Sequence, residues 1–412
     1  MTEQTKKLKI GLFGLGCVGQ GFLELLPKTF SSKGEIRKIC VRDIHKTRGV
    51  QFDGLTDKPE EILNDPDIDV VVELIDDADA SWEIVQKALN KGKSVVSANK
   101  RMIAKHLAEI IELQQQSGLS VLYEAAVCAS IPIIRNLEEY FSTDLLESLQ
   151  GIINGSSNYI LSQAEKQGIG ISEAIHLAQK LGFAEADPYL DIEGHDAANK
   201  LCILLAHAFG HICNPESIIR IGIDKIQTED LNWAAERDLR IKLLAKANIQ
   251  SDGSVQAFVL PHFIESEHPL YGVRDENNGV IIESIFSEEQ SFVGKGAGSI
   301  PTAAAVISDL AALYQHYQYP YHKIEKGGRI SELDLSGNLR VRITCNNAPE
   351  LQTALLGIGK SCDGIQQEII EELNLMEIQK ISKVSGIRVI AFDLGSYKKY
   401  CENENSNIHY IY

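Results

Sequence analysis

The stretch from Gly182 to Lys200 gathers more side chains that could do chemistry than any other part of the chain. Besides His195 and Lys200 it carries five carboxylates, at Glu185, Asp187, Asp191, Glu193 and Asp196. The segment that follows, Leu201–Ala206, is almost wholly apolar. A solvated acidic loop would not normally lead into a helix that must be buried. We therefore expect the start of this helix to point its charges into a cleft, where charged groups usually serve chemistry.

Asp196 and Lys200 stand four residues apart, which places both on one face of a helix. The alternative interpretation is a surface ion pair, worth roughly a few tenths of a kcal/mol. The apolar residues that follow favour burial instead. Several carboxylates near one lysine could hold an ammonium group and tune a proton donor.

A glycine-rich turn, Gly14-Leu15-Gly16-Cys17-Val18-Gly19, follows an expected strand over Leu8–Phe13 and opens an expected helix. Gly14 would permit the tight turn, Gly16 would let backbone N–H groups approach a pyrophosphate, and Gly19 would let the helix lie close to the sheet. The helix N-terminus adds a positive dipole end. This context predicts a dinucleotide site; a glycine turn without a ligand is the alternative.

The second expected strand, Ile36–Val41, ends beside Arg42 and Asp43. Asp43 could bond a ribose hydroxyl, whereas Arg42, with Lys46 or Arg48, could hold a 2′-phosphate. The three cations favour NADP over NAD. The alternative is a solvated strand end.

Three further segments could line a ligand. Asn154 and Gly155 lie in a strand–turn–helix pattern over Gly151–Tyr159, which could cradle an anion or a carbonyl. A second glycine loop, Gly294–Gly298, precedes a proline-started helix. Lys100 follows Ser97 at the carboxyl end of an expected parallel strand, the edge where open α/β sheets bind ligands. A capped helix without a ligand and an exposed lysine are the alternatives.

Apolar runs alternate with amphipathic helical patterns in the first third of the chain. The alternation predicts a Rossmann-like, doubly wound parallel α/β domain over residues 1–130, completed by about residues 295–325. Residues 131–294 are predicted to form an inserted α+β substrate-binding and dimerisation domain, with a longer helix around Asn232–Ala247. After a linker that ends at Gly327-Gly328, residues 330–412 are predicted to form a small C-terminal α+β domain.

Composition excludes several classes of protein. The net charge of −17 argues against nucleic acid and anionic membranes as partners. No apolar run reaches the length of a transmembrane helix, and the first residues lack the apolar stretch of a secretory signal. The eight scattered cysteines are typical of reduced thiols. We expect a cytoplasmic protein that acts on a small molecule.

Together these motifs resemble homoserine dehydrogenase, from the first strand to about Leu310. The motifs that carry the resemblance stand in order along the chain: Gly14–Gly19, Val95–Lys100, Tyr123–Val127, Asn154–Tyr159, Gly182–Lys200, and Gly296–Gly298 with Pro301–Ala303. The family interconverts aspartate 4-semialdehyde and homoserine by hydride transfer with NAD(P)H. The resemblance therefore implies an NAD(P)-dependent oxidoreductase of threonine and methionine biosynthesis.

The resemblance also implies roles for individual residues. Glu185 would bind the substrate ammonium, and Asp191 and Asp196 would orient the substrate and the lysines. Lys200 and Lys100 would stand at the reacting oxygen, one as proton donor or acceptor and the other as electrostatic support; a lowered lysine pKa would suit the first role. Asn154 would lie beside substrate and cofactor. The implied cofactor-binding residues are Gly14, Gly16, Cys17, Val18, Gly19, Arg42, Ser97, Lys100, Gly155 and Gly298.

Family members also bind a monovalent cation, sodium or potassium, and form dimers or tetramers through a sheet in the middle of the chain. The resemblance places the cation here at Glu124, Val127, Ala129 and Ile131, largely through backbone carbonyls. Beyond residue 330 the chain resembles an ACT regulatory domain only faintly. An interaction module without a ligand is the alternative there, and threonine feedback would follow from the ACT interpretation.

Two departures from the family pattern bear on the cofactor and the cation. Asp76-Asp77 stand where the family usually has two glycines, and two carboxylates near a pyrophosphate would repel it. Cys128-Ala129-Ser130 replace a glycine-rich turn. Two alternatives therefore stay open: another amino-acid semialdehyde dehydrogenase, or a catalytically weak regulatory protein that binds an amino acid.

Overall fold

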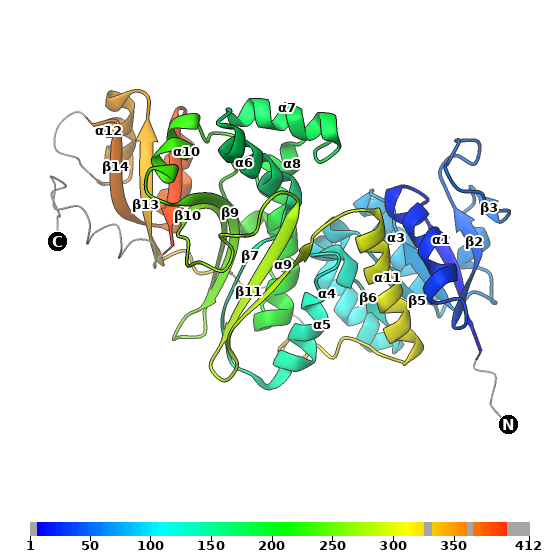
Figure 1. The fold of residues 1–412 in the computed structure, drawn as a ribbon. Helices are drawn as coiled ribbons and strands as arrows, with labels where there is room; N and C mark the ends of the chain where they lie inside the picture. Colours follow the sequence, from blue (N-terminus) through cyan, green and yellow to red (C-terminus); the bar gives the residue numbers. More distant parts are fainter. Residues whose placement is uncertain (1–5, 186, 325–331, 361–365, 394–412) are drawn as a thin grey trace.

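The structure is a computed structural model that describes residues 6–185, 187–324, 332–360 and 366–393. Two sheets organise these residues. A parallel sheet and its helices occupy one end of the elongated molecule, and a larger mixed sheet runs from the middle to the other end (Figure 1). The predicted linker end at Gly327-Gly328 lies outside the described residues.

The first sheet has six parallel strands in the order β3-β2-β1-β4-β5-β6. Its strands are β1 (Leu8–Phe13), β2 (Gly34–Cys40), β3 (Leu55–Thr56), β4 (Val70–Glu73), β5 (Ser94–Ser97) and β6 (Val121–Leu122). Its helices are α1 (Cys17–Thr29), α2 (Glu60–Leu63), α3 (Ala78–Asn90), α4 (Lys100–Ser117) and the returning α11 (Ser299–Tyr314). β4 is buried on both faces, as its unbroken valines predicted. The predicted doubly wound parallel fold is confirmed.

The second sheet has nine strands, ordered β12-β11-β7-β9-β10-β15-β13-β14, with β8 paired to β10. Its strands from the middle of the chain are β7 (Leu146–Ile152), β8 (Ile219–Arg220), β9 (Arg240–Ile249), β10 (Val255–Ile264), β11 (Asn277–Ser284) and β12 (Glu288–Lys295). The accompanying helices are α5 (Ile133–Glu138), α6 (Gly155–Gln167), α7 (Ile171–Leu181), α8 (Tyr189–Ile192), α9 (His195–Phe209) and α10 (Thr228–Ala235).

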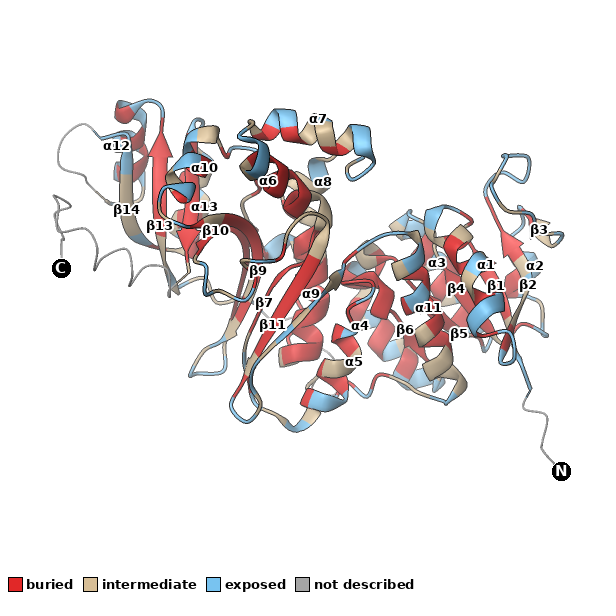
Figure 2. Ribbon diagram, in the orientation of Figure 1, coloured by how far each residue is buried: buried red, intermediate tan, exposed pale blue. Residues whose placement is uncertain are grey.

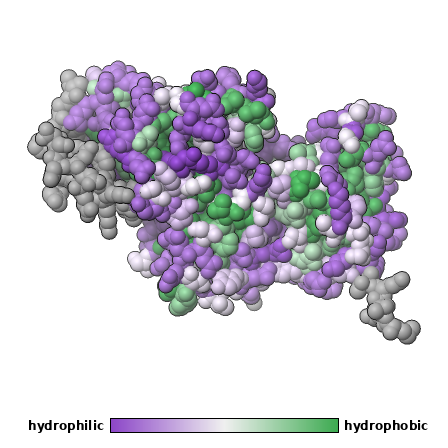
Figure 3. All heavy atoms as spheres, viewed as in Figure 1, coloured by the Kyte–Doolittle hydropathy of each residue, from purple (hydrophilic) through white to green (hydrophobic). Residues whose placement is uncertain are grey.

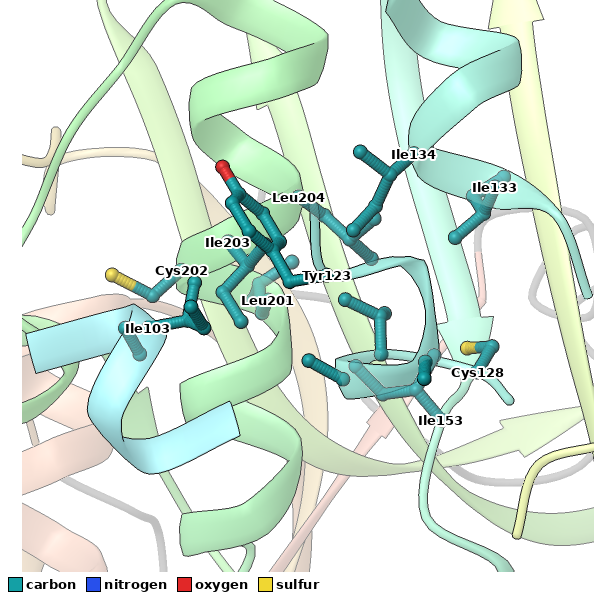
Figure 4. Close-up of a cluster of buried hydrophobic side chains, with 14 of the residues drawn as sticks. Ile103, Tyr123, Cys128, Ile133, Ile134, Ile153, Leu201, Cys202, Ile203 and Leu204 are labelled. Atoms are coloured by element: carbon teal, nitrogen blue, oxygen red, sulfur yellow. The ribbon is translucent and has the colours of Figure 1, made fainter. Parts of the chain in front are cut away.

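Helix α9 joins the two halves of the molecule. Glycines with left-handed backbone, Gly194 and Gly210, bound it at its two ends, and nearly every residue from Asp196 to Ala208 is buried. It contacts α4 of the first half and β9 and β10 of the second sheet. Figure 4 shows its residues Leu201–Leu204 near Tyr123 and Ile103 of the first half. The charged N-terminal turn of α9 is therefore held between the two halves.

The helix predicted around Asn232–Ala247 is wrong over most of its length. α10 ends at Ala235, Asp238 takes a left-handed backbone (φ 55°), and β9 begins at Arg240. β9 lies between β7 and β10 and is buried along most of its length. Because a strand covered on both faces need not alternate in polarity, its leucines, alanines and lysines read as a helical pattern in the sequence.

The C-terminal unit continues the second sheet instead of standing apart from it. It consists of β13 (Asn338–Cys345), α12 (Ala348–Gly357), β14 (Glu368–Asn374), α13 (Leu375–Ser382) and β15 (Ile387–Phe392). β15 pairs in parallel with β10 of the middle region. Residues 394–412 of the predicted C-terminal domain lie outside the described residues, and the domain boundaries stay a prediction.

Burial follows the central strands of both sheets and α9, whereas the edge strand β12 has no buried residue (Figure 2). Hydrophilic residues dominate the face drawn in Figure 3, with smaller apolar patches between them. Exposed apolar side chains include Phe286 and Val293, which lie on the hairpin that ends in the edge strand β12. No helix among the described residues is long and apolar enough to cross a membrane.

Candidate active site

The two lysines singled out in the sequence converge on one carboxylate. Lys100 begins α4 directly after β5, and Lys200 lies one turn into α9 beyond Asp196. The Nζ atom of Lys100 stands 2.5 Å from Oδ1 of Asp196, and the Nζ atom of Lys200 stands 2.9 Å from Oδ2. Asp196 and Lys200 are buried, whereas the Lys100 side chain keeps 39% of its surface exposed. The surface ion pair is thus excluded, and a ligand can reach the pair from the side of Lys100.

Electrostatics hold Asp196 and Lys100 in their charged forms. Burial alone would raise the pKa of Asp196, but the attraction of Lys100 and Lys200 outweighs it and holds that pKa well below its usual range. The attraction of Asp196 raises the pKa of Lys100 against the opposing effect of desolvation. A lowered pKa was expected for the lysine that exchanges a proton. That expectation is not met at Lys100, because its buried counter-ion favours the charged form.

Asn154 joins this trio to Asp191. Its Nδ2 atom donates to Oδ1 of Asp191 at 2.7 Å and to Oδ2 of Asp196 at 2.8 Å. Its Oδ1 atom accepts from the backbone N–H of Ser157, so the same side chain caps α6. Lys200 also donates to the carbonyl of Ile153 at 2.8 Å. Five of the six residues with implied catalytic or substrate roles, Asn154 among them, therefore form one network.

Glu185 is the exception among these residues. It is exposed on the segment after α7, where its backbone carbonyl accepts a hydrogen bond from Gln179. Among the described residues no contact joins its carboxylate to the lysines, and its neighbour Ala186 lies outside that set. The substrate-ammonium role implied for Glu185 stays a prediction.

The glycine-rich turn after β1 has the geometry that a dinucleotide requires. Gly14 has a left-handed backbone (φ 95°), and a side chain on it would meet the Leu74 carbonyl at 2.6 Å. A side chain on Gly19 would meet the Gly14 carbonyl at 2.3 Å, so this glycine lets α1 approach the strand. A side chain on Gly16 would meet nothing within 4 Å. The backbone at Gly16 is therefore open to an approaching ligand.

The loop that precedes α11 adjoins this turn. Gly298 has φ 116°, and the Ser299 hydroxyl donates to the Cys17 carbonyl at 2.6 Å. A side chain on Gly21 in α1 would meet the Ser299 hydroxyl at 2.5 Å. The structure thus brings together Cys17 and Gly298, although 281 positions separate them in the chain.

Some of the side chains expected to contact the cofactor ribose or its 2′-phosphate already have hydrogen-bond partners within the chain. Arg42 is exposed at the end of β2. The Arg48 guanidinium donates to the carbonyls of Asp43 and Lys46, and the Asp43 carboxylate accepts from the His45 N–H. Arg48 is therefore engaged within the loop, whereas Arg42 and Lys46 are exposed cations that a 2′-phosphate could meet.

Asp76 and Asp77 have local partners. The Asp77 carboxylate accepts from the N–H groups of Asp79 and Ala80 and so caps α3. Asp76 is fully exposed and lies 3.1 Å from Arg101. A helix cap and a compensated surface charge account for both residues, so the repulsion expected at the pyrophosphate is reduced.

Sequence reasoning missed the buried carboxylate of Glu73, which lies at the end of β4 next to β5. Glu73 ends β4, accepts from the Ser97 hydroxyl at 2.6 Å and accepts from the Ile75 N–H at 2.7 Å. Burial raises its pKa. The Ser97 hydroxyl in turn accepts from the Asn99 N–H, so Ser97 offers a ligand little beyond its backbone. The signal was available, since Glu73 ends the strand next to that of Ser97.

The segment implied to bind a cation is mostly buried, and hydrogen bonds of Glu124 join it to α5. The Glu124 carboxylate accepts from the N–H groups of Ile134 and Arg135 at the start of α5, and burial raises its pKa. The described residues contain no group of three or more His, Cys, Asp or Glu side chains that could hold a metal. A cation here would therefore depend on backbone carbonyls.

Two cavities lie away from this network. One, of about 490 Å³, is lined by α12 and α13 residues such as Thr353 and Lys380. The other, of about 440 Å³, lies where α13 meets the middle region, beside Glu193 and Arg220. Neither is lined by Lys100 or Lys200.

Comparison with known proteins agrees with the family resemblance found in the sequence. Residues 14–124 match the NAD-binding domain of homoserine dehydrogenase, and residues 132–311 match homoserine dehydrogenase itself. The homoserine dehydrogenase of Bacillus subtilis is 36% identical over 321 residues, which cover 76% of this chain and 74% of that protein. The enzyme of Synechocystis is 39% identical over 313 residues, covering 74% and 72%. The chain belongs to the homoserine dehydrogenase family.

Solved homoserine dehydrogenase structures match the fold. The enzyme of Thiobacillus denitrificans has a TM-score of 0.82 at 32% identity and covers 94% of this chain and 98% of its own. A hyperthermophilic archaeal homoserine dehydrogenase in complex with NADPH has a TM-score of 0.64 at 26% identity, covering 76% and 99%. As a homoserine dehydrogenase family member, this chain is an oxidoreductase with a nicotinamide cofactor and a small-molecule substrate.

Proposed function

We propose that this protein interconverts aspartate 4-semialdehyde and L-homoserine, with the reaction centred on Lys100, Asp196 and Lys200. The single observation that carries the proposal is that two lysines from different halves of the molecule meet one buried carboxylate. The two lysine ammonium groups lie close together at Asp196. This arrangement suits a reaction in which negative charge grows on a carbonyl oxygen. A place in threonine and methionine biosynthesis accompanies this activity, and a cytoplasmic location stays a prediction.

The two lysines polarise the aldehyde oxygen of the semialdehyde and supply the proton that the new hydroxyl requires. Asp196 keeps Lys100 protonated, so Lys100 suits stabilisation of the oxygen or donation of a proton in the reducing direction. Lys200 is held by Asp196 and by the Ile153 carbonyl, which fixes its Nζ atom in position. Glu185 would receive the substrate ammonium, and Asp191 would help to orient the substrate.

A nicotinamide cofactor would supply or accept the hydride. The pyrophosphate of the cofactor would be held by residues of the glycine-rich turn, namely Gly14, Gly16, Cys17, Val18 and Gly19. The rest of the cofactor would lie along Gly155, Gly298, Ser97 and Lys100. The open backbone at Gly16 supports this placement. The exposed Arg42 at the end of β2 supports a preference for NADP over NAD.

A sodium or potassium ion would bind near Glu124, through the carbonyls of Val127, Ala129 and Ile131. Glu124 supports this proposal indirectly, because its buried carboxylate holds the start of α5 next to the segment.

A homodimer or homotetramer would form through the second sheet. The exposed Phe286 and Val293 at its β12 edge support that assembly, which light scattering tests.

The decisive test is a spectrophotometric assay with L-homoserine and each nicotinamide cofactor, with and without potassium. We expect homoserine-dependent reduction of NADP, faster than reduction of NAD and enhanced by the cation. Turnover of another amino-acid alcohol in preference to homoserine would favour a different semialdehyde dehydrogenase. Absence of saturable NADPH binding at millimolar concentration would favour the catalytically weak regulatory protein.

A further inference from the structure

Glu73 lies between the two turns that form the candidate site at the edge of the parallel sheet. It is the last residue of β4, and its partners in the sheet are Phe13 of β1 and Ser97 of β5. The glycine-rich turn follows Phe13 directly, and the turn that leads to Lys100 follows Ser97 directly. The Glu73 side chain has no exposed surface. Its carboxylate therefore has to find its hydrogen-bond partners within the chain.

The first partner of this carboxylate connects it to Lys100. The Ser97 hydroxyl donates to Oε2 of Glu73 at 2.6 Å, and the same hydroxyl oxygen accepts from the Asn99 N–H at 3.0 Å. The backbone of Asn99 is thereby tied to β4 immediately before Lys100, the first residue of α4. These two hydrogen bonds fix the point from which the Lys100 side chain extends.

The second partner connects the carboxylate to the same turn by a separate route. The Ile75 N–H donates to Oε1 of Glu73 at 2.7 Å. The Nδ2 atom of Asn99 donates to the Ile75 carbonyl at 3.1 Å, and the Oδ1 atom of Asn99 caps α4 by accepting from the Met102 N–H. Both oxygens of Glu73 are thus linked to the residue that precedes Lys100.

The placement of Lys100 decides whether it meets its counter-ion. Its Nζ atom stands 2.5 Å from Oδ1 of Asp196, which belongs to α9. We propose that Glu73 is a positioning residue that fixes the turn between β5 and α4 and so holds Lys100 against Asp196. Such a residue acts through geometry and does not touch the substrate. Its effect on turnover rests on the proposed function, whereas its effect on the position of Lys100 does not.

Loss of this anchor should weaken the attraction between Lys100 and its counter-ion. The charged groups around Lys100 include Asp196, Asp191 and Asp76, with Lys200 on the second oxygen of Asp196. The attraction of Asp196 raises the pKa of Lys100 against the opposing effect of desolvation. If the turn relaxes and the ammonium group moves away, this pKa falls, so Lys100 loses its proton at lower pH. A residue that only stabilised the fold would have no such effect on one lysine.

Competitive labelling tests the placement of Lys100 without relying on turnover. Trace acetic anhydride reacts with neutral amines only, and the Lys100 side chain is 39% exposed, so mass spectrometry of its peptide gives the pH midpoint of labelling. E73L removes both acceptors, and S97A removes the connecting hydroxyl. In both variants the midpoint should move to lower pH. E73Q should show a smaller shift, because its amide oxygen can still accept from the Ile75 N–H.

Kinetics test the consequence for the reaction. In E73L and in S97A, kcat should fall by roughly 10- to 100-fold, the effect of displacing a catalytic group by about 1 Å. The double variant should lose less than the product of the two single losses, because residues that act through one hydrogen-bond network are not additive. Fully additive losses would contradict the link from Glu73 through Ser97.

A second buried carboxylate provides the control. Asp230 of α10 has no exposed surface, but it pairs with Arg342 of β13 and has no bond to the turn before α4. D230N should lower the unfolding temperature and leave the labelling midpoint of Lys100 at its wild-type value. A wild-type midpoint in folded E73L or in S97A would overturn the inference, and so would an equal shift in D230N. Absence of homoserine turnover in the wild type would instead overturn the proposed function, and the labelling result would still decide the role of Glu73.

Discussion

At the scale of single residues, the proposed chemistry depends on how Asp196 is shared between Lys100 and Lys200. Its two oxygens face two lysines, and its pKa is held low because both cations outweigh the desolvation of a buried carboxylate. Asn154 adds a neutral donor that ties the same carboxylate to Asp191. Each lysine is thus positioned by a group that cannot easily change its own charge.

Replacing Lys200 with alanine should abolish most turnover. Loss of a positioned proton donor or electrostatic partner typically costs roughly 10²–10⁴-fold in rate. Cofactor affinity, measured by nicotinamide fluorescence, should stay near the wild-type value because Lys200 is held by Asp196 and Ile153. K180A is a suitable control, since Lys180 is exposed on α7. Unchanged kcat in K200A would contradict the assignment of this lysine.

Replacing Asp196 with asparagine should alter the pH dependence of the reaction. The attraction of Asp196 raises the pKa of Lys100, so its removal lowers that pKa. A reducing step that needs protonated Lys100 should then lose activity at lower pH than the wild type, which moves the alkaline limb of the kcat/KM profile toward neutrality. The measurement is the rate of aspartate 4-semialdehyde reduction between pH 6 and about pH 10. An alkaline limb that stays in place would exclude Lys100 as the titrating group.

At the scale of elements, Gly16 and Gly19 of the glycine-rich turn meet different structural requirements. Gly19 lets α1 approach β1, and Gly16 leaves its backbone uncovered. Local sequence is enough to identify such a turn, because the requirement for a small residue and a tight bend is met within six positions. The same reasoning failed at β9, whose identity depends on its neighbours β7 and β10.

Alanine at Gly16 and alanine at Gly19 should therefore change different properties of the protein. G19A introduces a side chain 2.3 Å from the Gly14 carbonyl and should lower the free energy of unfolding by about 1–3 kcal/mol. G16A meets nothing within 4 Å and should leave stability near wild type while weakening cofactor binding. Thermal unfolding and NADPH titration of both variants separate the two effects. Wild-type cofactor affinity in G16A would argue against a pyrophosphate at this turn.

At the scale of the whole molecule, the C-terminal unit is joined to the middle region by a buried charge network. Asp230 of α10 has no exposed surface and lies 2.7 Å from Arg342 of β13 and 2.9 Å from Arg388 of β15. Arg342 also pairs with Glu368 of β14. Together with the parallel pairing of β10 and β15, this network makes the C-terminal strands part of one sheet.

Asparagine at Asp230 should loosen that junction. Removal of one partner leaves two arginines buried without full compensation, which typically costs about 3–5 kcal/mol. D230N should unfold at lower temperature and become more sensitive to proteases near β13. E368Q is the control, because Glu368 is 41% exposed and its loss should cost much less. Equal stability of the two variants would show that the network contributes little.

The sequence by itself was enough to determine the parallel fold, the glycine-rich turn after β1 and the charged residue types of the proposed site. These properties depend on local backbone requirements and on runs of apolar residues, which a single segment displays. Only the tertiary structure decided that Lys100 and Lys200 share Asp196 and that Asp77 serves as a helix cap. Those relations arise between segments far apart in the chain, where burial and the direction of each side chain are set by packing of the two halves against α9.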